Sequence, residues 1–156
     1  MLVVVFVVGI GLVGALSFFN ININNQNEVK NELIAAGLAQ EGADLVRNRI
    51  DFEKMKGSSW ASIVLGLRTD LGSGGCNYID YKSLTDTSHS CSSGNESVCF
   101  SGGRYQQCPG GTDIGMKRTL EIKPNSNGDG SLVIVCTVSW NGRSTKSTDI
   151  IYNNAY

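Results

Sequence analysis

The sequence predicts an α+β protein in which a long N-terminal helix leads into a small antiparallel β-meander. Three observations predict it. No charged side chain precedes Glu28, and the residues up to Phe19 are almost all apolar. A helical stripe of apolar residues follows over residues 28–52, and residues 132–140 alternate between two faces of a strand. We expect the apolar half of the helix to project and the amphipathic half to pack on the meander.

The apolar run has nearly the roughly 20 residues that a helix needs to cross a bilayer. A cleavable secretory signal would need a basic segment, a shorter apolar core and a cleavage site, which this run does not offer; a plain membrane anchor is the stronger alternative. No proline lies between Met1 and Pro109, so the helix can continue into its amphipathic half. A helix of about 50 residues is roughly 75 Å long, against a radius of gyration near 13 Å for a domain of about 100 residues. The apolar half therefore needs either lipid or other copies of itself.

The amphipathic half shows apolar residues at steps of three, four or seven, which is the spacing of one helix face. The stripe consists of Val29, Leu33, Ala36, Ala43, Val46 and Ile50, and Gln40 interrupts it. Charged side chains occupy much of the remaining surface. We expect one face of the meander to cover this stripe.

Glycine and serine mark the beginning of the globular part. Gly57 is a plausible end for the long helix, and Ser58 or Ser59 can cap a short second helix. Residues 76–84 are typical of an extended segment, and residues 83–116 are predicted to form a surface loop because Ser, Gly, Thr and Asn dominate there.

The last forty residues predict three antiparallel strands, at 118–122, 132–140 and 145–152. Asn141 and Gly142 form a strong hairpin signal between the last two. The side chains that share the inner face give the predicted domain core: Leu120, Ile122, Leu132, Ile134, Val138 and Trp140.

Five cysteines lie in the C-terminal two-thirds of the chain, which is typical of an exported protein with disulfides. Cys136 falls on the core face, and we expect it to be a buried free thiol. The disulfide candidates are Cys76, Cys91, Cys99 and Cys108. Local pairing, 76 with 91 and 99 with 108, is the leading arrangement, but the sequence does not fix the connectivity.

Composition and motifs give no sign of catalysis or of a bound cofactor. A net charge of −1 offers no basic face for nucleic acid. Asn125 and Asp129 have calcium-loop spacing, but Cys136 stands where a bidentate glutamate is needed. His89 and Cys91 lack the second histidine of a zinc set. We predict no enzyme activity, no metal, no cofactor and no nucleic-acid partner.

The uncharged start "LVVVFVVGIG", the amphipathic continuation and the β-domain together resemble a type IV pilin. The segment "LAQEGADLVRNRID" is similar to the helix end of bacterial pilin-like proteins, and the ending "VIVCTVSWNGRSTKSTDIIYNNAY" is similar to their last two strands. The resemblance covers residues 1–54 and 117–156, and the middle resembles them poorly. Archaeal pilins and flagellins share the apolar helix, but the helix-end signature favours bacteria.

The resemblance implies a structural subunit of an extracellular type IV pilus-like filament (a fimbrium), with cell adhesion and motility among the roles of such filaments. Residues 1–27 would be the membrane and filament-core helix, and residues 28–56 its amphipathic continuation. Residues 57–156 would be the extracellular domain, with a variable loop at 72–116 and a β-meander at 117–156. The implied partners are other copies of the chain in a helical homopolymer, the inner membrane before assembly, a prepilin peptidase, and an assembly ATPase with its platform.

Polymerisation would use the apolar side chains of the first segment: Leu2, Val3, Val4, Val5, Phe6, Val7, Val8, Ile10, Leu12, Val13, Leu16, Phe18 and Phe19. Gly9, Gly11 and Gly14 would form a soft spot in the assembled helix, because each interior glycine costs up to about 1 kcal/mol relative to alanine. Close approach of neighbouring helices is an equally good reason for these glycines. Many pilins carry a proline shortly after this region, where this chain has Ser17 or a neighbour.

The beginning of the chain departs from the pilin pattern. Pilins usually carry a glutamate early in the apolar helix, whereas this chain has no acidic residue before Glu28. We expect about five residues ending in glutamate to precede Met1 in the mature protein; otherwise the buried amine must be neutralised differently.

Two other functions stay open. One is a minor pilin or pseudopilin that acts as an adhesive tip or a secretion piston. The other is a membrane-anchored extracellular binding domain that never polymerises.

Overall fold

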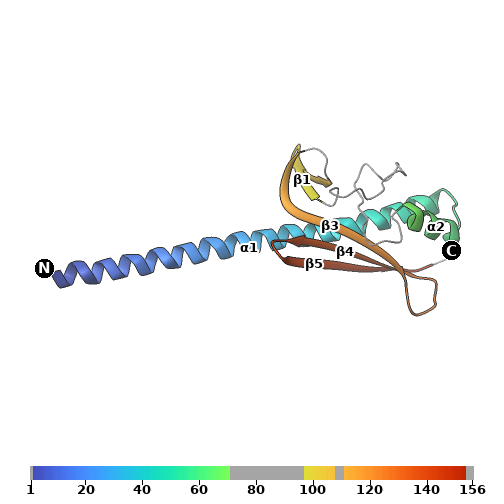
Figure 1. Cartoon of the computed structure of the whole chain (residues 1–156). Helices are drawn as coiled ribbons and strands as arrows, with labels where there is room; N and C mark the ends of the chain where they lie inside the picture. The colour runs from blue at the N-terminus through green and yellow to red at the C-terminus, as the bar shows by residue number, and fades with distance from the viewer. Residues whose placement is uncertain (1, 71–96, 108–110, 154–156) are drawn as a thin grey trace. The chain divides into compact units, whose positions relative to one another are not determined.

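A computed structural model describes residues 2–70, 97–107 and 111–153 of the chain. Within these ranges, two helices precede five strands: α1 (Leu2–Met55), α2 (Trp60–Asp70), β1 (Ser97–Ser101), β2 (Arg104–Gln107), β3 (Thr112–Pro124), β4 (Leu132–Trp140) and β5 (Arg143–Ile151) (Figure 1). The chain divides into two compact units, residues 1–34 and residues 35–156, and α1 contributes to both. The fold is therefore α+β, with a long N-terminal helix and an antiparallel sheet.

The five strands form one antiparallel sheet in the order β2-β1-β3-β4-β5. Strands β3, β4 and β5 make the predicted meander, with Leu120 opposite Cys136 and Cys136 opposite Ser147. Asn141 (φ 45°) and Gly142 (φ 77°) form the two-residue turn between β4 and β5. Both residue types tolerate a positive φ, which this kind of hairpin requires, so the predicted turn is confirmed.

The surface loop predicted over residues 83–116 is wrong for the part that the structure describes. Strands β1 and β2 and the first residues of β3 lie there instead. Gly102 (φ 59°) and Gly103 (φ 79°) make the tight turn between β1 and β2, and pairing with β3 satisfies the backbone of β1. The extended segment predicted at 76–84 lies outside the described residues.

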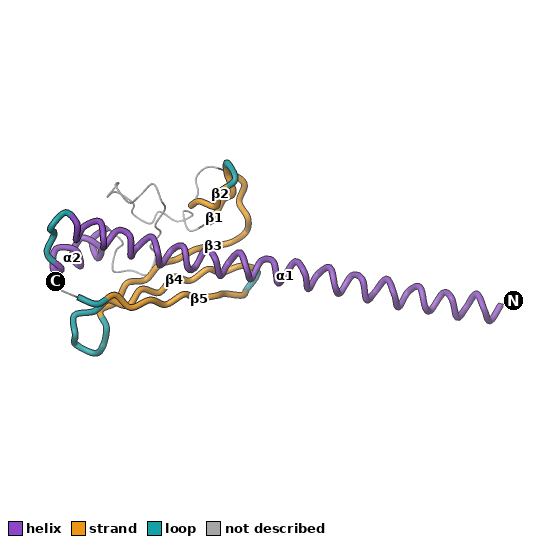
Figure 2. The backbone as a smooth tube through the Cα atoms, turned by 180° about the vertical axis from the view of Figure 1, so that it is seen from behind, coloured by secondary structure: helices purple, strands orange, loops and turns teal. Residues whose placement is uncertain are grey.

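A bulge bends the N-terminal part of β3. Val98 pairs with Met116, but the next residue of β1, Cys99, pairs with Asp113. Gly115 takes a φ of 71°, and its N–H donates to Asp113 Oδ1 at 2.8 Å. Ile114 and Gly115 are therefore two extra residues on β3. Extra residues on one strand strengthen the local twist, which accounts for the curled sheet edge that carries β1 and β2 (Figures 1 and 2).

The core of the second unit lies between the sheet and the part of α1 from Ala35 onward (Figure 2). Side chains of β4 alternate between buried and half-buried along the whole strand. Of the predicted core residues, Ile122 is partly buried, and the others are buried: Leu120, Leu132, Ile134, Val138 and Trp140.

The predicted helix stripe is correct only in its C-terminal half. Ala43, Val46 and Ile50 are buried in the core, whereas Val29 is 65 % exposed and Leu33 is 75 % exposed. Ala36 is exposed as well. Periodicity shows which side of a helix is apolar, but the extent of the sheet decides how far that side is covered.

The end of α1 and the start of α2 follow the predicted signals. Gly57 has a φ of 81°; its N–H donates to the carbonyl of Lys54, and the N–H of Ser58 donates to the carbonyl of Glu53. This pair of bonds is a Schellman motif, in which a glycine in the left-handed conformation ends the helix. The N–H of Ser62 donates a hydrogen bond of 3.3 Å to the hydroxyl of Ser59, so Ser59 is the N-cap of α2.

Candidate functional site

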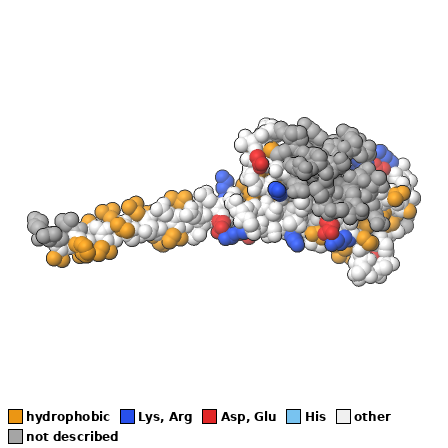
Figure 3. Space-filling view, in the orientation of Figure 1, with side chains coloured by type: hydrophobic (Ala, Val, Ile, Leu, Met, Phe, Trp, Pro, Cys, Tyr) orange, Lys and Arg blue, Asp and Glu red, His pale blue; other side chains and the backbone are white. Residues whose placement is uncertain are grey.

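The N-terminal part of α1 presents an apolar surface on every side. The apolar side chains described between Val3 and Phe19 are each 54–74 % exposed. Hydrophobic side chains gather along this part of the helix, and charged ones appear only further along the chain (Figure 3). Single exposed apolar residues are ordinary, but a continuous apolar surface marks a site for lipid or protein. All predicted polymerisation residues except Leu2 and Val5, whose side chains lie outside the described residues, are exposed here.

Within the described residues, α1 is the helix that is long and apolar enough to cross a membrane. None of its most apolar stretch is buried. Length and composition fit a membrane anchor or a signal sequence, and they fit association with a membrane.

The three glycines of this segment are open positions. A methyl group added at Gly9, Gly11 or Gly14 would meet nothing within 4 Å, and α1 is helical through all three. The soft spot expected at these glycines concerns the assembled helix, so it stays a prediction.

Between the apolar segment and Glu28 lies a run of uncharged amides, which we call the amide belt. Asn22 is half-exposed and the other five are exposed; the belt consists of Asn20, Asn22, Asn24, Asn25, Gln26 and Asn27. The belt is polar but uncharged, whereas the segment before it is apolar and the segment after it is charged.

In the second unit, α1 approaches the sheet closely at Gly42. A Cβ built on Gly42 would collide with Cys136 Sγ on β4 and would lie 3.5 Å from Arg118 Cδ on β3. Only a glycine allows this approach. The sulfur is fully buried, and its desolvation raises the pKa of the Cys136 thiol to about 11. Such a thiol is inert at neutral pH, and its role is packing.

Among the ion pairs of the described residues, Arg118–Glu41 and Arg47–Asp149 join α1 to the sheet. Arg118 Nη1 lies 3.3 Å from Glu41 Oε2, and the Arg118 side chain is only 3 % exposed. Arg47 Nη2 lies 2.6 Å from Asp149 Oδ2 at a half-exposed position. The sequence reasoning missed Arg118 because a charged residue does not suggest burial, although it is in phase with Leu120 on β3. Together these pairs orient the helix on the sheet.

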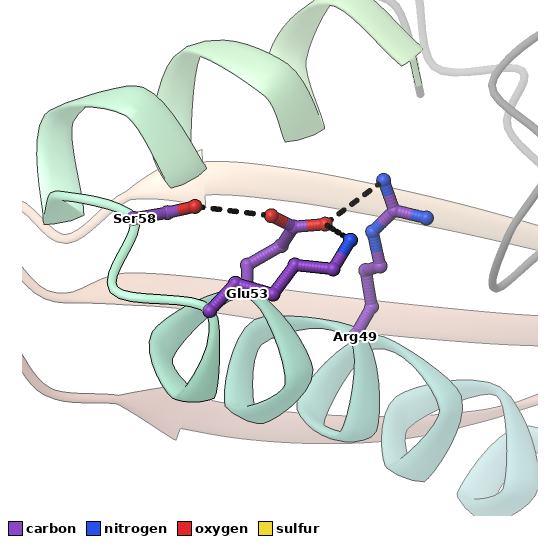
Figure 4. A network of polar contacts seen from close by, with 4 residues as sticks. Arg49, Glu53 and Ser58 are labelled. Atoms are coloured by element: carbon purple, nitrogen blue, oxygen red, sulfur yellow. Dashed lines mark hydrogen bonds and ion pairs between the residues drawn. The ribbon is translucent and has the colours of Figure 1, made fainter.

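A small polar network fixes the C-terminal end of α1 (Figure 4). Glu53 Oε2 accepts a hydrogen bond of 3.1 Å from the hydroxyl of Ser58. Glu53 Oε1 lies 3.4 Å from Arg49 Nη2 and 3.5 Å from Lys56 Nζ. The carboxylate therefore ties the last turn of the helix to the residue after Gly57.

The loop with calcium-like spacing is a self-contained turn. Asp129 Oδ1 accepts hydrogen bonds from the N–H and from the hydroxyl of Ser131, and these bonds lower the pKa of Asp129. Trp60 Nε1 donates a hydrogen bond of 2.9 Å to the carbonyl of Gly130, which connects the loop to α2. Within the described ranges, no group of three or more His, Cys, Asp or Glu side chains could hold a metal ion. His89 lies outside those ranges.

Among the described cysteines, Cys136 is free and buried, as predicted. Cys99 on β1 is buried as well and is disulfide-bonded. Cys76, Cys91 and Cys108 lie outside the described residues. The local pairing therefore stays a prediction.

Comparisons of the chain with protein-family models, with curated proteins and with solved structures found no match. The arrangement of a long, apolar N-terminal helix and an antiparallel sheet is compatible with a pilin-like architecture.

Proposed function

We propose that this chain is a pilin-like structural subunit that polymerises through its apolar helix into an extracellular filament. The observation that carries the proposal is the exposed apolar surface of α1 between Val3 and Phe19, in a chain whose other unit has its own core. Burying a large apolar side chain contributes roughly 1.5–3 kcal/mol relative to water. A surface of this kind needs a partner, and identical helices offer one.

The charge-free part of α1 supports a membrane stage before assembly. Residues 2–27 make a helix of about 39 Å at 1.5 Å per residue, close to the bilayer with its headgroup layers, which is about 40–45 Å thick. Because lipid is as apolar as the neighbouring helices, leaving the membrane gains little from the hydrophobic effect. Assembly would then depend on helix packing and on an energy-driven machine, which the pilin resemblance implies.

Two alternative functions also use the apolar helix. A minor pilin or pseudopilin would be a rare component of a filament made of another chain. A membrane-anchored binding domain would use α1 only to cross the bilayer, a use that its length and hydropathy also permit. Abundance in sheared material and self-assembly separate the three functions.

The test is to shear the surface of cells that make the chain, then image the sheared material and identify its proteins by mass. Leu12→Lys would place a charge in the apolar surface, and Ile150→Lys would place the same charge on the exposed side of β5. We expect filaments built mainly of this chain, lost with Leu12→Lys and kept with Ile150→Lys. Retention of the wild-type chain in membranes as single copies would refute the proposal. Its recovery only as a trace in filaments would favour the minor pilin.

A further inference from the structure

The amide belt is an unusual choice for a helix surface. Six amides occupy eight consecutive positions, and five of the six are asparagine. Asparagine forms helices less well than Glu, Lys or Gln, because its side chain competes for backbone hydrogen bonds. On a helix that faces only water, charged residues such as Glu and Lys would stabilise the helix better. In an apolar surrounding, each amide would need a hydrogen-bond partner.

The belt covers two opposite sides of α1. Residues three and four apart share a helix face, so Asn20, Asn24 and Asn27 lie on one side. Residues two apart lie on nearly opposite sides, so Asn22 lies across from them, and Asn25 and Gln26 share its side. A single neighbouring helix would contact only one of these sides. Amides on both sides suit a helix with neighbours on both sides.

We propose that the amide belts of neighbouring copies hydrogen-bond to one another in the filament and set the axial register of the helix bundle. The partner is a second copy of this chain, so the inference rests on the proposed function. An amide both donates and accepts hydrogen bonds, so identical belts are complementary without opposing charges. The apolar segment packs without selecting a register, whereas a few polar side chains at a helix interface do select one.

The experiment compares two triple variants in filaments sheared from cells. One removes one side of the belt through Asn20→Ala, Asn24→Ala and Asn27→Ala. The matched control removes three amides of the same helix outside the belt, through Asn31→Ala, Gln40→Ala and Asn48→Ala. Both sets replace amides by alanine, so any gain in helix propensity is similar.

The measurement is the amount of subunit that a nonionic detergent releases from the filaments at equilibrium. Interhelical hydrogen bonds in apolar surroundings are individually modest, so losing three predicts about a twentyfold rise in released subunit for the belt variant. The control should stay close to wild type. Asn20→Gln, Asn24→Gln and Asn27→Gln together keep the amides and should return most of the lost stability.

Equal release from belt variant and control would overturn the inference while leaving the proposed function intact. Unchanged filament stability with poorer membrane retention would also overturn it, because the belt would then serve the headgroup layer. If the belt variant does not accumulate, the wild-type filament structure decides: belt amides of neighbouring copies must lie within hydrogen-bond distance. A wild-type chain that forms no filaments would instead remove the proposed function itself.

Discussion

The contact between Gly42 and Cys136 allows a quantitative test of how α1 sits on the sheet. Gly42→Ala would add a methyl group where Cys136 Sγ already lies, and the short cysteine side chain, fully buried on β4, has little freedom to move. Overpacking a core usually costs 1–3 kcal/mol, and a collision this close belongs at the upper end, about 3 kcal/mol. Replacing a helical glycine by alanine returns about 1 kcal/mol. We expect a net loss of about 2 kcal/mol in the free energy of unfolding.

Gly37→Ala is the matched control. It lies on the same helix, is exposed, and would place its methyl group in open space. Only the helix-propensity gain applies, so we expect it to stabilise the chain by about 0.5–1 kcal/mol. The two alanine variants should therefore differ by about 3 kcal/mol, although the chemical change is identical.

The assay is urea unfolding of the full chain in detergent micelles, followed by the fluorescence of Trp60 and Trp140. Adding Cys136→Ala to Gly42→Ala removes the sulfur and makes room for the new methyl group. The double variant should be more stable than the sum of the two single effects predicts, by about 1–3 kcal/mol. Equal stability of the Gly42 and Gly37 variants, or additive effects in the double variant, would refute the close approach.

Three further predictions concern other parts of the chain. Because burial raises the pKa of Cys136 from 9.0 to about 11, its contribution to stability is complete below pH 9 and is lost as the pH rises to 11. Wild type should lose roughly 2–3 kcal/mol more than Cys136→Ala over that interval, and parallel curves would contradict this. Gly57→Ala should cost about 1–2 kcal/mol because of its positive φ, whereas Gly66→Ala, inside α2 and in open space, should not destabilise; equal thermal shifts would exclude this explanation. In a filament structure, the stretch from Gly9 to Gly14 should be the least regular part of α1, and unbroken helical hydrogen bonds there would show that prediction to be wrong.

The long helix and the meander could be predicted because their patterns are long and purely local. The alternation along β4 identified its inner face, and with it the buried position of Cys136. The Asn141-Gly142 pair predicted its turn because both residues accept the positive φ found there. Gly57 and Ser59 likewise marked a helix end and a helix start through backbone chemistry that does not depend on distant residues.

Features that depend on partners distant in sequence could not be predicted in the same way. Strands β1 and β2 are short, and they depend on pairing: β1 pairs with both β2 and β3. The Gly102-Gly103 pair was a hairpin signal that could have revealed them. The close approach at Gly42 depends on which strand passes beneath the helix, and no local pattern encodes that.

One part of the candidate site could be predicted from the sequence, and another part could not. Exposure of the apolar segment could be expected from its length and lack of charge. The boundary of the covered helix could not, because Leu33 belongs to the same periodic stripe as Val46 and yet is exposed. The fold of the whole second unit decides which residues of the stripe are covered.

The most direct measurement of the proposed function is the structure of a filament sheared from cells that make this chain. We predict a helical polymer of this subunit in which the apolar segment of α1 is buried among the same segments of neighbouring copies. A filament whose core lacks this helix, or a chain recovered only as single copies in the membrane, would contradict the proposal.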